Sequence, residues 1–508
     1  MQNIIKKSSN FYCGLTLFIS AIIWTTVIWF ILSESIAMFE VDSYYHIRLA
    51  DMMAKYGLIL PSEFPWTACS IWNNAFFDKE WLFHVILIPF IRWFGELVGC
   101  RAFILAAAFL CAIAWGSLLR TLKIRYLFFA LLLIIFVSGP AFEGRLLMCR
   151  PHLLSIILLA TFLNCLVKNK RVLMFALSYV YAISYTGCWQ IIPIALLYDL
   201  ITHWKSEESK GWKHWSSIYA FAGIMTGMII NPYFPSNISG LYIQNIMILK
   251  AAILGGTIYR LNLGMELYPP ALIKIFTVYL PLFILNAVAF VSLLEKRKTV
   301  ENFRLKLFFG CLSVTYMILT MCVVKFTDYF IPLAALFLIL YFQDMISAWN
   351  RGKFFLVTFS ILLILFGAYS TLVLKKEIYK TNITYSDSAE WINKNSEPSI
   401  DSLHPQKLIF TSSWDDTPYL FYSLPTFKYL VFLDPYFMYS FSPDKYRMWQ
   451  KISEGKTSNP ARLIQQEFGT SIVFVNKRHK TLQMQLEESG QAKLKFEGKD
   501  GEKVFVLK

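Results

Sequence analysis

A short segment near the N-terminus carries the first residues whose types could do chemistry. Residues 39–48 read Phe-Glu-Val-Asp-Ser-Tyr-Tyr-His-Ile-Arg, and Asp42 stands just before a helical stretch that extends to about Lys55. A carboxylate at this position can cap the free amides of the first helical turn. An ionised acid held rigidly beside a reacting group can instead bind a divalent cation or serve as a general base. Asp42 alone does not decide between these interpretations.

A second group lies in a short turn after the third apolar run. Glu143 and Arg145 end the sequence Ser-Gly-Pro-Ala-Phe-Glu-Gly-Arg, and Arg150 and His152 open the next predicted helix. Arginine suits phosphate oxygens because its planar guanidinium offers paired donors and stays charged. Anchoring of helix ends at a membrane interface explains any one of these residues alone. Their concentration in one turn favours a binding site.

Three further segments each place one or two such residues in a predicted loop. Glu266 lies in the run 263–270, and Lys325 lies in a tight turn between two apolar runs. Trp414 and Asp415 follow a predicted strand, where a loop can direct side chains toward the membrane. A solvated loop charge is the commoner role of a lone Glu or Lys. These residues gain meaning if the fold brings them to the first two groups.

The composition indicates that these segments are held by a membrane protein. Of the 508 residues, 56% are hydrophobic, 17% are aromatic and only 16% are charged, which excludes a disordered chain and argues against an ordinary soluble enzyme. Lys and Arg retained in cytoplasmic loops explain the net charge of +15 without a nucleic-acid partner. The nine Cys are scattered singly, with no CxxC pair and none after about residue 375, which argues against a zinc site or a disulfide framework in that stretch.

Runs of mostly apolar residues predict about eleven membrane-spanning helices, each needing about 20 residues. A cytoplasmic N-terminus puts the basic loops on the cytoplasmic side, as the positive-inside rule requires. These loops include Arg120–Arg125, Lys168–Arg171, Lys205–Lys213, Lys296–Lys306 and Arg351–Lys353. The predicted spans are 12–33, 100–120, 125–140, 152–168, 172–186, 188–203, 216–231, 272–294, 306–323, 328–346 and 354–374.

One apolar run, 82–98, is predicted to lie at the outer interface rather than to cross the membrane. Arg92 and Glu96 interrupt it, and counting it as a span would move the basic run Arg120–Arg125 to the outside. This choice sets the side of every later loop.

The topology divides the chain into a transmembrane domain, 1–374, and an external domain, 375–508. Two long loops, 34–99 and 232–271, are predicted on the same side as the external domain, and loops of this length are usually functional. The external domain is predicted to be a small soluble α/β domain. Its predicted strands are Lys407–Thr411, Tyr429–Leu433, Ser471–Asn476 and Lys503–Leu507, and its predicted helices are 386–395 and 460–468.

In their order along the chain, these motifs resemble those of the catalytic subunits of oligosaccharyltransferases, which belong to the GT-C membrane glycosyltransferases. The segment Val-Asp-Ser-Tyr-Tyr-His-Ile-Arg is similar to the first-loop motif of that family, which implies that Asp42 is the metal-binding and catalytic carboxylate. Glu143 stands where the family keeps its second-loop acids, and the resemblance implies a catalytic and metal-binding role for it. This chain has a single acid there, so His152 is a candidate substitute ligand.

The resemblance also implies roles for the later motifs. Gly264-Met265-Glu266 before Tyr-Pro-Pro is similar to the segment whose Glu meets the acceptor. The turn at Lys325 resembles an Arg-Phe turn that contacts lipid-linked phosphates, with Arg145 and Arg150 as further phosphate ligands. Ala389-Glu390-Trp391-Ile392 leading to Trp414-Asp415 resembles the acceptor-binding Trp-Trp-Asp-Tyr-Gly motif, of which only the Trp-Asp step is retained.

The expected function is therefore transfer of a sugar or glycan from a polyprenyl-phosphate-type lipid donor to a protein, lipid or polysaccharide acceptor. A divalent cation, Mg²⁺ or Mn²⁺, is the implied cofactor, and the outer face of a bacterial plasma membrane is the expected location. One alternative keeps the GT-C fold with a lipid monophosphate-sugar donor and a lipid or polysaccharide acceptor. Another is a non-catalytic transporter or scaffold, although transporters usually place ionisable residues near mid-membrane and often have repeated halves. A sensor whose tail binds a ligand is a further alternative.

Overall fold

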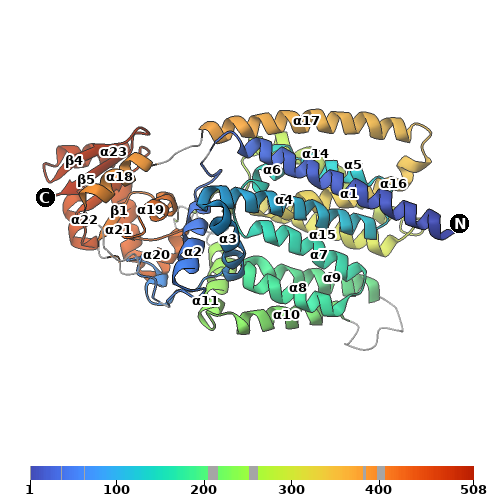
Figure 1. The fold of residues 1–508 in the computed structure, drawn as a ribbon, viewed down its shortest axis with the longest axis horizontal. Coiled ribbons are helices and arrows are strands. Elements are labelled where there is room, and N and C mark those ends of the chain that lie inside the picture. Colours follow the sequence, from blue (N-terminus) through green and yellow to red (C-terminus); the bar gives the residue numbers. More distant parts are fainter. Residues whose placement is uncertain are drawn as a thin grey trace.

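The protein is a polytopic α-helical membrane protein with a C-terminal α/β domain, as the sequence predicts. Figure 1 shows the helical bundle with the N-terminus at its far end and the α/β domain beyond the other end. The predicted loop Lys205–Lys213 lies outside the described residues. The computed structural model describes residues 2–35, 37–61, 63–203, 215–250, 261, 263–380, 385–396, 405 and 407–508.

The bundle is built from long apolar helices, and a helix is found in every predicted span. Among the described residues, six helices are long and apolar enough to cross a membrane. The bent pair α5 (Leu127–Phe136) and α6 (Pro140–Leu146) adds a seventh candidate if its two helices together form a single span. Shorter apolar helices fill the remaining predicted spans, so the number of crossings stays a prediction. The bundle helices are α1 (Gln2–Leu32), α4 (Glu96–Thr121), α5 (Leu127–Phe136), α6 (Pro140–Leu146), α7 (His152–Val167), α8 (Arg171–Ser184), α9 (Ile191–His203), α10 (Ser216–Ile230), α13 (Leu272–Lys274), α14 (Leu280–Glu295), α15 (Phe303–Cys322), α16 (Thr327–Ala348) and α17 (Gly352–Lys380).

The bent pair, α5 and α6, has a local cause. The two helices meet at 90°, and Gly139 between them has φ 55°, a conformation that favours glycine. Pro140 then opens α6, where its missing N–H costs nothing. A Cβ on Gly139 would lie 2.9 Å from the Phe366 ring of α17, so the break also depends on close packing. Arg145, near the end of α6, lines a cavity described below.

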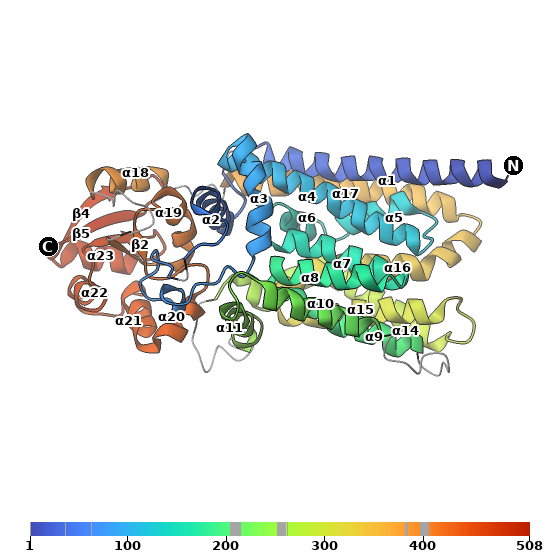
Figure 2. The same cartoon turned by 60° about the horizontal axis from the view of Figure 1, so that its bottom comes forward.

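Two helices of the first loop, α2 (Asp42–Tyr56) and α3 (Trp81–Phe94), lie at the domain end of the bundle. Figure 2 shows α3 lying crosswise to the long axes of α1 and α4. This direction is the one expected of an interfacial helix, and α3 covers most of the run predicted at 82–98, whose last residues open α4. The loop helix α11 (Ser236–Tyr242) lies at the same end.

The C-terminal domain is a five-stranded mixed sheet in the order β2-β1-β3-β5-β4, packed with short helices. Strand β1 is parallel to β2 and β3, and β5 is antiparallel to β3 and β4. The predicted helices 386–395 and 460–468 are confirmed. The strand predicted at Tyr429–Leu433 was wrong beyond Tyr429, and strand β4 was missed. The elements are α18 (Ser386–Asn395), β1 (Leu408–Thr411), α19 (Thr417–Ser423), β2 (Lys428–Tyr429), α20 (Pro435–Phe441), α21 (Pro443–Ser453), α22 (Pro460–Phe468), β3 (Ile472–Val475), α23 (Lys480–Glu488), β4 (Ala492–Glu497) and β5 (Lys503–Leu507).

The first loop is joined to the α/β domain through the edge of its sheet. Thr67 forms a parallel bridge with Tyr429, and the amides of Ala68 and Cys69 donate to the carbonyls of Tyr429 and Leu430. This pairing covers an edge strand that would otherwise expose unpaired backbone groups. Arg48 of α2 reinforces the junction because its guanidinium donates twice to the Tyr422 carbonyl, at 2.9 and 2.5 Å.

A buried aromatic cluster fills the space behind this junction. Phe64 and Phe76 stack with ring centroids 4.5 Å apart, and Trp66 packs against Phe421 of the α/β domain. Tyr45 of α2 packs on the same cluster through Trp72. Such aromatic pairs contribute about 0.5–1.5 kcal/mol each beyond burial. The cluster therefore fixes α2, and with it Asp42, relative to the α/β domain.

Candidate active site

A cavity of about 370 Å³ lies between the domain end of the bundle and the α/β domain. Its lining comes from segments that are far apart in the sequence: the start of α2, the residues before α3, the turn before α7, four further segments of the bundle (185–190, 244–249, 264–267 and 323–329) and two loops of the domain. Eight of the predicted site residues line it, namely Asp42, Arg145, Arg150, His152, Glu266, Lys325, Trp414 and Asp415.

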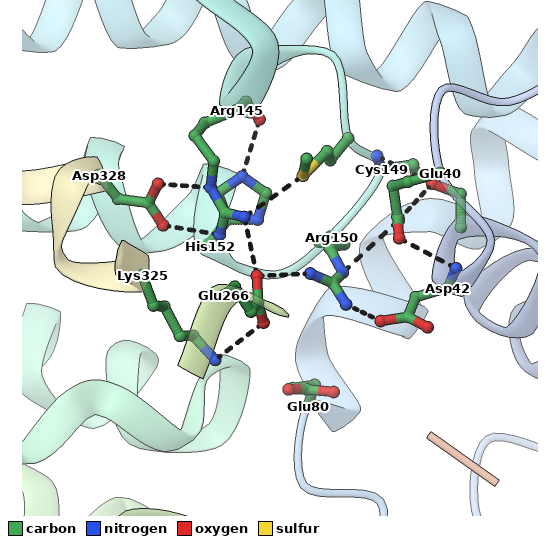
Figure 3. Close-up of polar contacts among 12 residues, drawn as sticks. Glu40, Asp42, Glu80, Arg145, Cys149, Arg150, His152, Glu266, Lys325 and Asp328 are labelled. Carbon is green, nitrogen blue, oxygen red and sulfur yellow. Dashed lines mark hydrogen bonds and ion pairs between the residues drawn. The ribbon is translucent and has the colours of Figure 1, made fainter. Parts of the chain in front are cut away.

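Arg150 is the central cation of this cavity. Its guanidinium pairs with Asp42, lies 3.5 Å from the Glu40 carboxylate and donates to Glu266 at 2.9 Å. Figure 3 shows Arg150 between the two acids of the first loop and Glu266. Glu40 in turn accepts from the Asp42 amide at 3.0 Å and from the Ser43 hydroxyl at 2.9 Å. Asp42 is thus held by Arg150 as well as by its place at the first turn of α2.

Glu266 lies among three cations. Arg145 and Arg150 donate to the same carboxylate oxygen at 2.8 and 2.9 Å, and the Lys325 Nζ lies 3.8 Å from the other oxygen. Burial raises the pKa of Glu266, but the charges of Arg150, Arg145 and Lys325 outweigh burial and hold that pKa well below its usual range. Glu266 is therefore ionised, and it occupies the position that another anion would need.

The two remaining cations have different surroundings. Arg145 is fixed by a bidentate pair with Asp328, at 2.6 and 3.0 Å, where α16 begins. The side chain of Lys325 is 35% exposed and lies over the Tyr185 ring, 5.9 Å from its centroid. Lys325 therefore has room to meet a ligand, whereas Arg145 is held by the protein.

The structure does not bring Glu143 to this cavity. Its side chain is fully buried in α6 and accepts from the Thr371 hydroxyl of α17 at 3.4 Å. Its other carboxylate oxygen has no hydrogen-bond partner among the described residues. The Cβ of the next residue, Gly144, would face Leu374 and Phe39. Glu143 thus lies on the α17 side of α6, apart from the residues that Arg145 joins.

The three predicted cation ligands, Asp42, Glu143 and His152, do not fit a divalent ion. Asp42 is paired with the Arg150 guanidinium, and His152 uses Nε2 to donate to the Arg145 carbonyl at 2.8 Å. Glu143, the third predicted ligand, faces α17. Across the residues that the structure describes, no group of three or more His, Cys, Asp or Glu side chains is arranged to hold a metal. The arginines supply the positive charge in this cavity.

The two acceptor residues predicted in the tail reach the cavity from the α/β domain. Trp414 and Asp415 lie in a short 3₁₀ helix between β1 and α19. Asp415 is held by Arg478, whose guanidinium donates to both carboxylate oxygens at 2.7 Å. The ring of Trp414 lies beside Gly264, in the loop that carries Glu266. The cavity is thus closed on one side by the domain.

Sequence reasoning missed several polar residues of the cavity, namely Glu40, His46, Lys79, Glu80 and Asp434. Burial raises the pKa of Glu80 above its usual range, and one Glu80 oxygen has no hydrogen-bond partner among the described residues. Burial likewise raises the pKa of Asp434 to about 6. Helical spacing could have predicted that His46 lies near Asp42, because residues four positions apart lie on the same face of a helix.

The chain was compared with known proteins. Neither the comparison with protein-family models nor that with curated proteins gives a match. Among solved structures, the archaeal oligosaccharyltransferase AglB from Archaeoglobus fulgidus, in complex with an inhibitory peptide and a dolichol-phosphate, matches with a TM-score of 0.64. The identity is 12%, over 93% of this chain and 70% of that chain. The chain has the oligosaccharyltransferase fold. The resemblance that the sequence motifs indicate is thus confirmed for the fold.

Two further structures are similar. The A. fulgidus enzyme in complex with Zn and sulfate matches with a TM-score of 0.60 and 12% identity, over 97% of this chain and 73% of that chain. ArnT from Cupriavidus metallidurans in the apo state matches over 98% of both chains, with a TM-score of 0.48 and 11% identity. At 12% identity, the likeness to A. fulgidus AglB shows a shared fold. It does not identify the donor or the acceptor of this chain.

Proposed function

We propose that the protein is a membrane glycosyltransferase that moves a sugar or glycan from a polyprenyl-phosphate-type lipid to an acceptor on the outer face of the membrane. The observation that carries this proposal is the convergence of Arg145, Arg150 and Lys325 with Asp42 and Glu266 in one cavity. The position of the cavity at the end of an apolar bundle supports it, because a polyprenyl lipid keeps its tail in the bilayer and its phosphate at the surface.

The cations explain how the donor would be bound and activated. When the bond between sugar and phosphate breaks, negative charge develops on the phosphate, and fixed cations stabilise that charge. Lys325 is the most accessible of the three, and Arg150 supplies the planar fork that phosphate oxygens accept best. A bound phosphate competes with Glu266 for these cations. Arg145 still holds Glu266 at 2.8 Å when the phosphate takes Lys325 and Arg150.

The acceptor would enter from the side of the α/β domain, where Trp414 and Asp415 line the cavity. A protein, a lipid or a polysaccharide acceptor is consistent with this entry. We further propose that the chain divides at 374/375 into a transmembrane domain and an extracytoplasmic domain, with the N-terminus in the cytoplasm of a bacterial cell. The opposite placement of the N-terminus and the α/β domain in Figure 1 supports this orientation.

The test uses the purified full chain in lipid nanodiscs with polyprenyl-phosphate and polyprenyl-diphosphate sugars as donors. Asp42→Asn should lower release of the lipid phosphate by about 100-fold or more, because Arg150 loses the charge that positions it. Asp51→Asn is the matched control, since Asp51 lies in the same helix, is also buried and is also salt-bridged, to Arg48 and Lys55. Wild-type turnover by Asp42→Asn would refute the assignment.

A further inference from the structure

A chain of three buried side chains leads from the first loop into the cavity. The Asp78 carboxylate lies 2.7 Å from Nδ1 of His84, and Nε2 of His84 lies 2.8 Å from Nδ1 of His46. All three side chains are buried: Asp78 is 2% exposed, His84 is 0% exposed and His46 is 4% exposed. His46 lines the cavity, whereas Asp78 and His84 lie behind it. Neither Asp78 nor His84 is needed by the donor site described above.

The hydrogen-bond directions along this chain follow from its acidic end. In the neutral form of His84, Nδ1–H donates to the Asp78 carboxylate, and Nε2 of His84 is left as an acceptor. Nδ1–H of His46 must then donate to His84, and Nε2 of His46 carries the free lone pair. Among the described residues, no group bonds this nitrogen. Because His46 lines the cavity, its free lone pair is the one available to a bound substrate.

We propose that the acceptor of this enzyme is a hydroxyl group and that Nε2 of His46 takes its proton, with His84 and Asp78 as positioning residues. This inference rests on the proposed function. In the step, the acceptor oxygen forms a bond to the anomeric carbon of the sugar, and the bond from that carbon to the phosphate oxygen breaks. The proton moves from the acceptor oxygen to His46, and the lipid phosphate leaves with the bonding electron pair.

The choice of a hydroxyl over an amide rests on which groups are free. An amide nitrogen has a delocalised lone pair, so it is a weaker nucleophile than a hydroxyl oxygen and needs groups that hold and activate it. Carboxylates could hold its N–H groups, but Asp42 and Glu266 are engaged by the guanidinium groups of Arg150 and Arg145. A hydroxyl needs a single base beside it, and His46 provides one on the same face of α2 as Asp42.

The surroundings of His46 keep its ring neutral. Burial is the main cause, and the neighbouring His84, Lys79 and His152 add to it, so the pKa of His46 lies well below its usual range. The other charged groups that line the cavity are Glu80 before α3, Glu40 and Asp42 at the start of α2, Arg145, Arg150, Glu266 and Lys325 from the bundle, and Asp415 and Asp434 from the α/β domain. A neutral imidazole can accept a proton at physiological pH.

The test follows donor cleavage by the full-length protein in nanodiscs, with water as the smallest hydroxyl acceptor and octyl glucoside as a larger one. His46→Gln should leave the Kd for polyprenyl phosphate unchanged and lower kcat by about 100- to 10,000-fold. It should also remove the fall in rate that the wild type shows as acid protonates His46. His479→Gln, which alters a histidine of the α/β domain, is the matched control and should leave both quantities unchanged.

A second variant keeps the test decisive if His46→Gln does not fold. Asp78→Asn should lower kcat by roughly 10- to 100-fold at an unchanged Kd, because an amide no longer fixes the tautomer of His84. A kcat within threefold of wild type in either folded variant would overturn the inference. So would transfer by the wild type to an Asn-containing peptide but to no hydroxyl. A wild type that neither binds nor cleaves any polyprenyl-linked donor would instead refute the proposed function.

Discussion

Replacing Glu266 with glutamine should tighten the binding of polyprenyl phosphate. Glu266 shares Arg145, Arg150 and Lys325 with the incoming anion, and it lies 2.8 and 2.9 Å from the two guanidinium groups. A phosphate bound to the same groups would lie about 5 Å from the carboxylate, where two unit charges repel by about 3 kcal/mol at an effective dielectric constant of about 20. Glu266→Gln removes this repulsion, which corresponds to roughly 100-fold in Kd.

The same change should make the ligand-free protein less stable, because three cations lose their shared counter-charge. Breaking a buried ion pair by removing one partner typically costs about 3–5 kcal/mol. Thermal unfolding and titration with fluorescent polyprenyl phosphate, both in nanodiscs, measure the two effects. Glu390→Gln is the control, since Glu390 is 65% exposed and pairs with Lys394 on the surface of α18. An unchanged or weaker Kd in Glu266→Gln would refute the placement of the phosphate beside these cations.

Three other results are expected. Chelation with EDTA should leave the transfer rate unchanged, because Arg150 and not a metal pairs with Asp42; loss of activity that Mg²⁺ or Mn²⁺ restores would contradict this. Glu143→Gln should leave both transfer and thermal stability intact, because one Glu143 oxygen lacks a hydrogen-bond partner among the described residues and the side chain faces α17. A large fall in kcat in this variant would contradict the prediction and indicate a catalytic role for Glu143. The third result concerns the stability of the α/β domain: burial is the larger cause and the charge of Asp415 the smaller cause that together raise the pKa of Asp416 from 3.8 to about 7. The folded state therefore binds this proton more tightly than the unfolded chain, so stability should fall as pH rises from about 4 to about 7. Asp416→Asn should flatten that dependence in thermal unfolding, and an unaltered slope would contradict it.

Much of the fold could be predicted from the sequence because membrane spans and buried strands have strong local patterns. The helices 386–395 and 460–468 were predicted to the residue, since each carries its apolar residues at helical spacing. Strand β4 was missed because it lies at the edge of the sheet, where its charged side chains face solvent and leave no apolar run. The strand predicted after Tyr429 ends early because the chain leaves the sheet to line the cavity.

Charge type alone identifies the predicted cationic residues in the sequence, whereas the direction of a side chain such as Glu143 is set by the fold. If the motifs belong to one site, their cationic side chains must lie close together. The structure places Arg145, Arg150 and Lys325 in the lining of one cavity. Glu143 lies only two residues before Arg145, yet the short helix α6 directs the two side chains to different neighbours. The 90° break at Gly139-Pro140 sets these directions, and its angle also depends on packing against Phe366 of α17, which the local sequence does not reveal. The link from Asp78 through His84 to His46 is likewise a tertiary contact between α2 and α3.

The most direct test of the account is the structure of the protein in nanodiscs with a bound polyprenyl phosphate. The phosphate should lie within hydrogen-bond distance of Lys325 and Arg150, inside the cavity that Asp42 and Glu266 line. A phosphate bound elsewhere, with Arg150 still paired to Asp42 and Glu266 and Lys325 without contact to the lipid, would contradict the central claim.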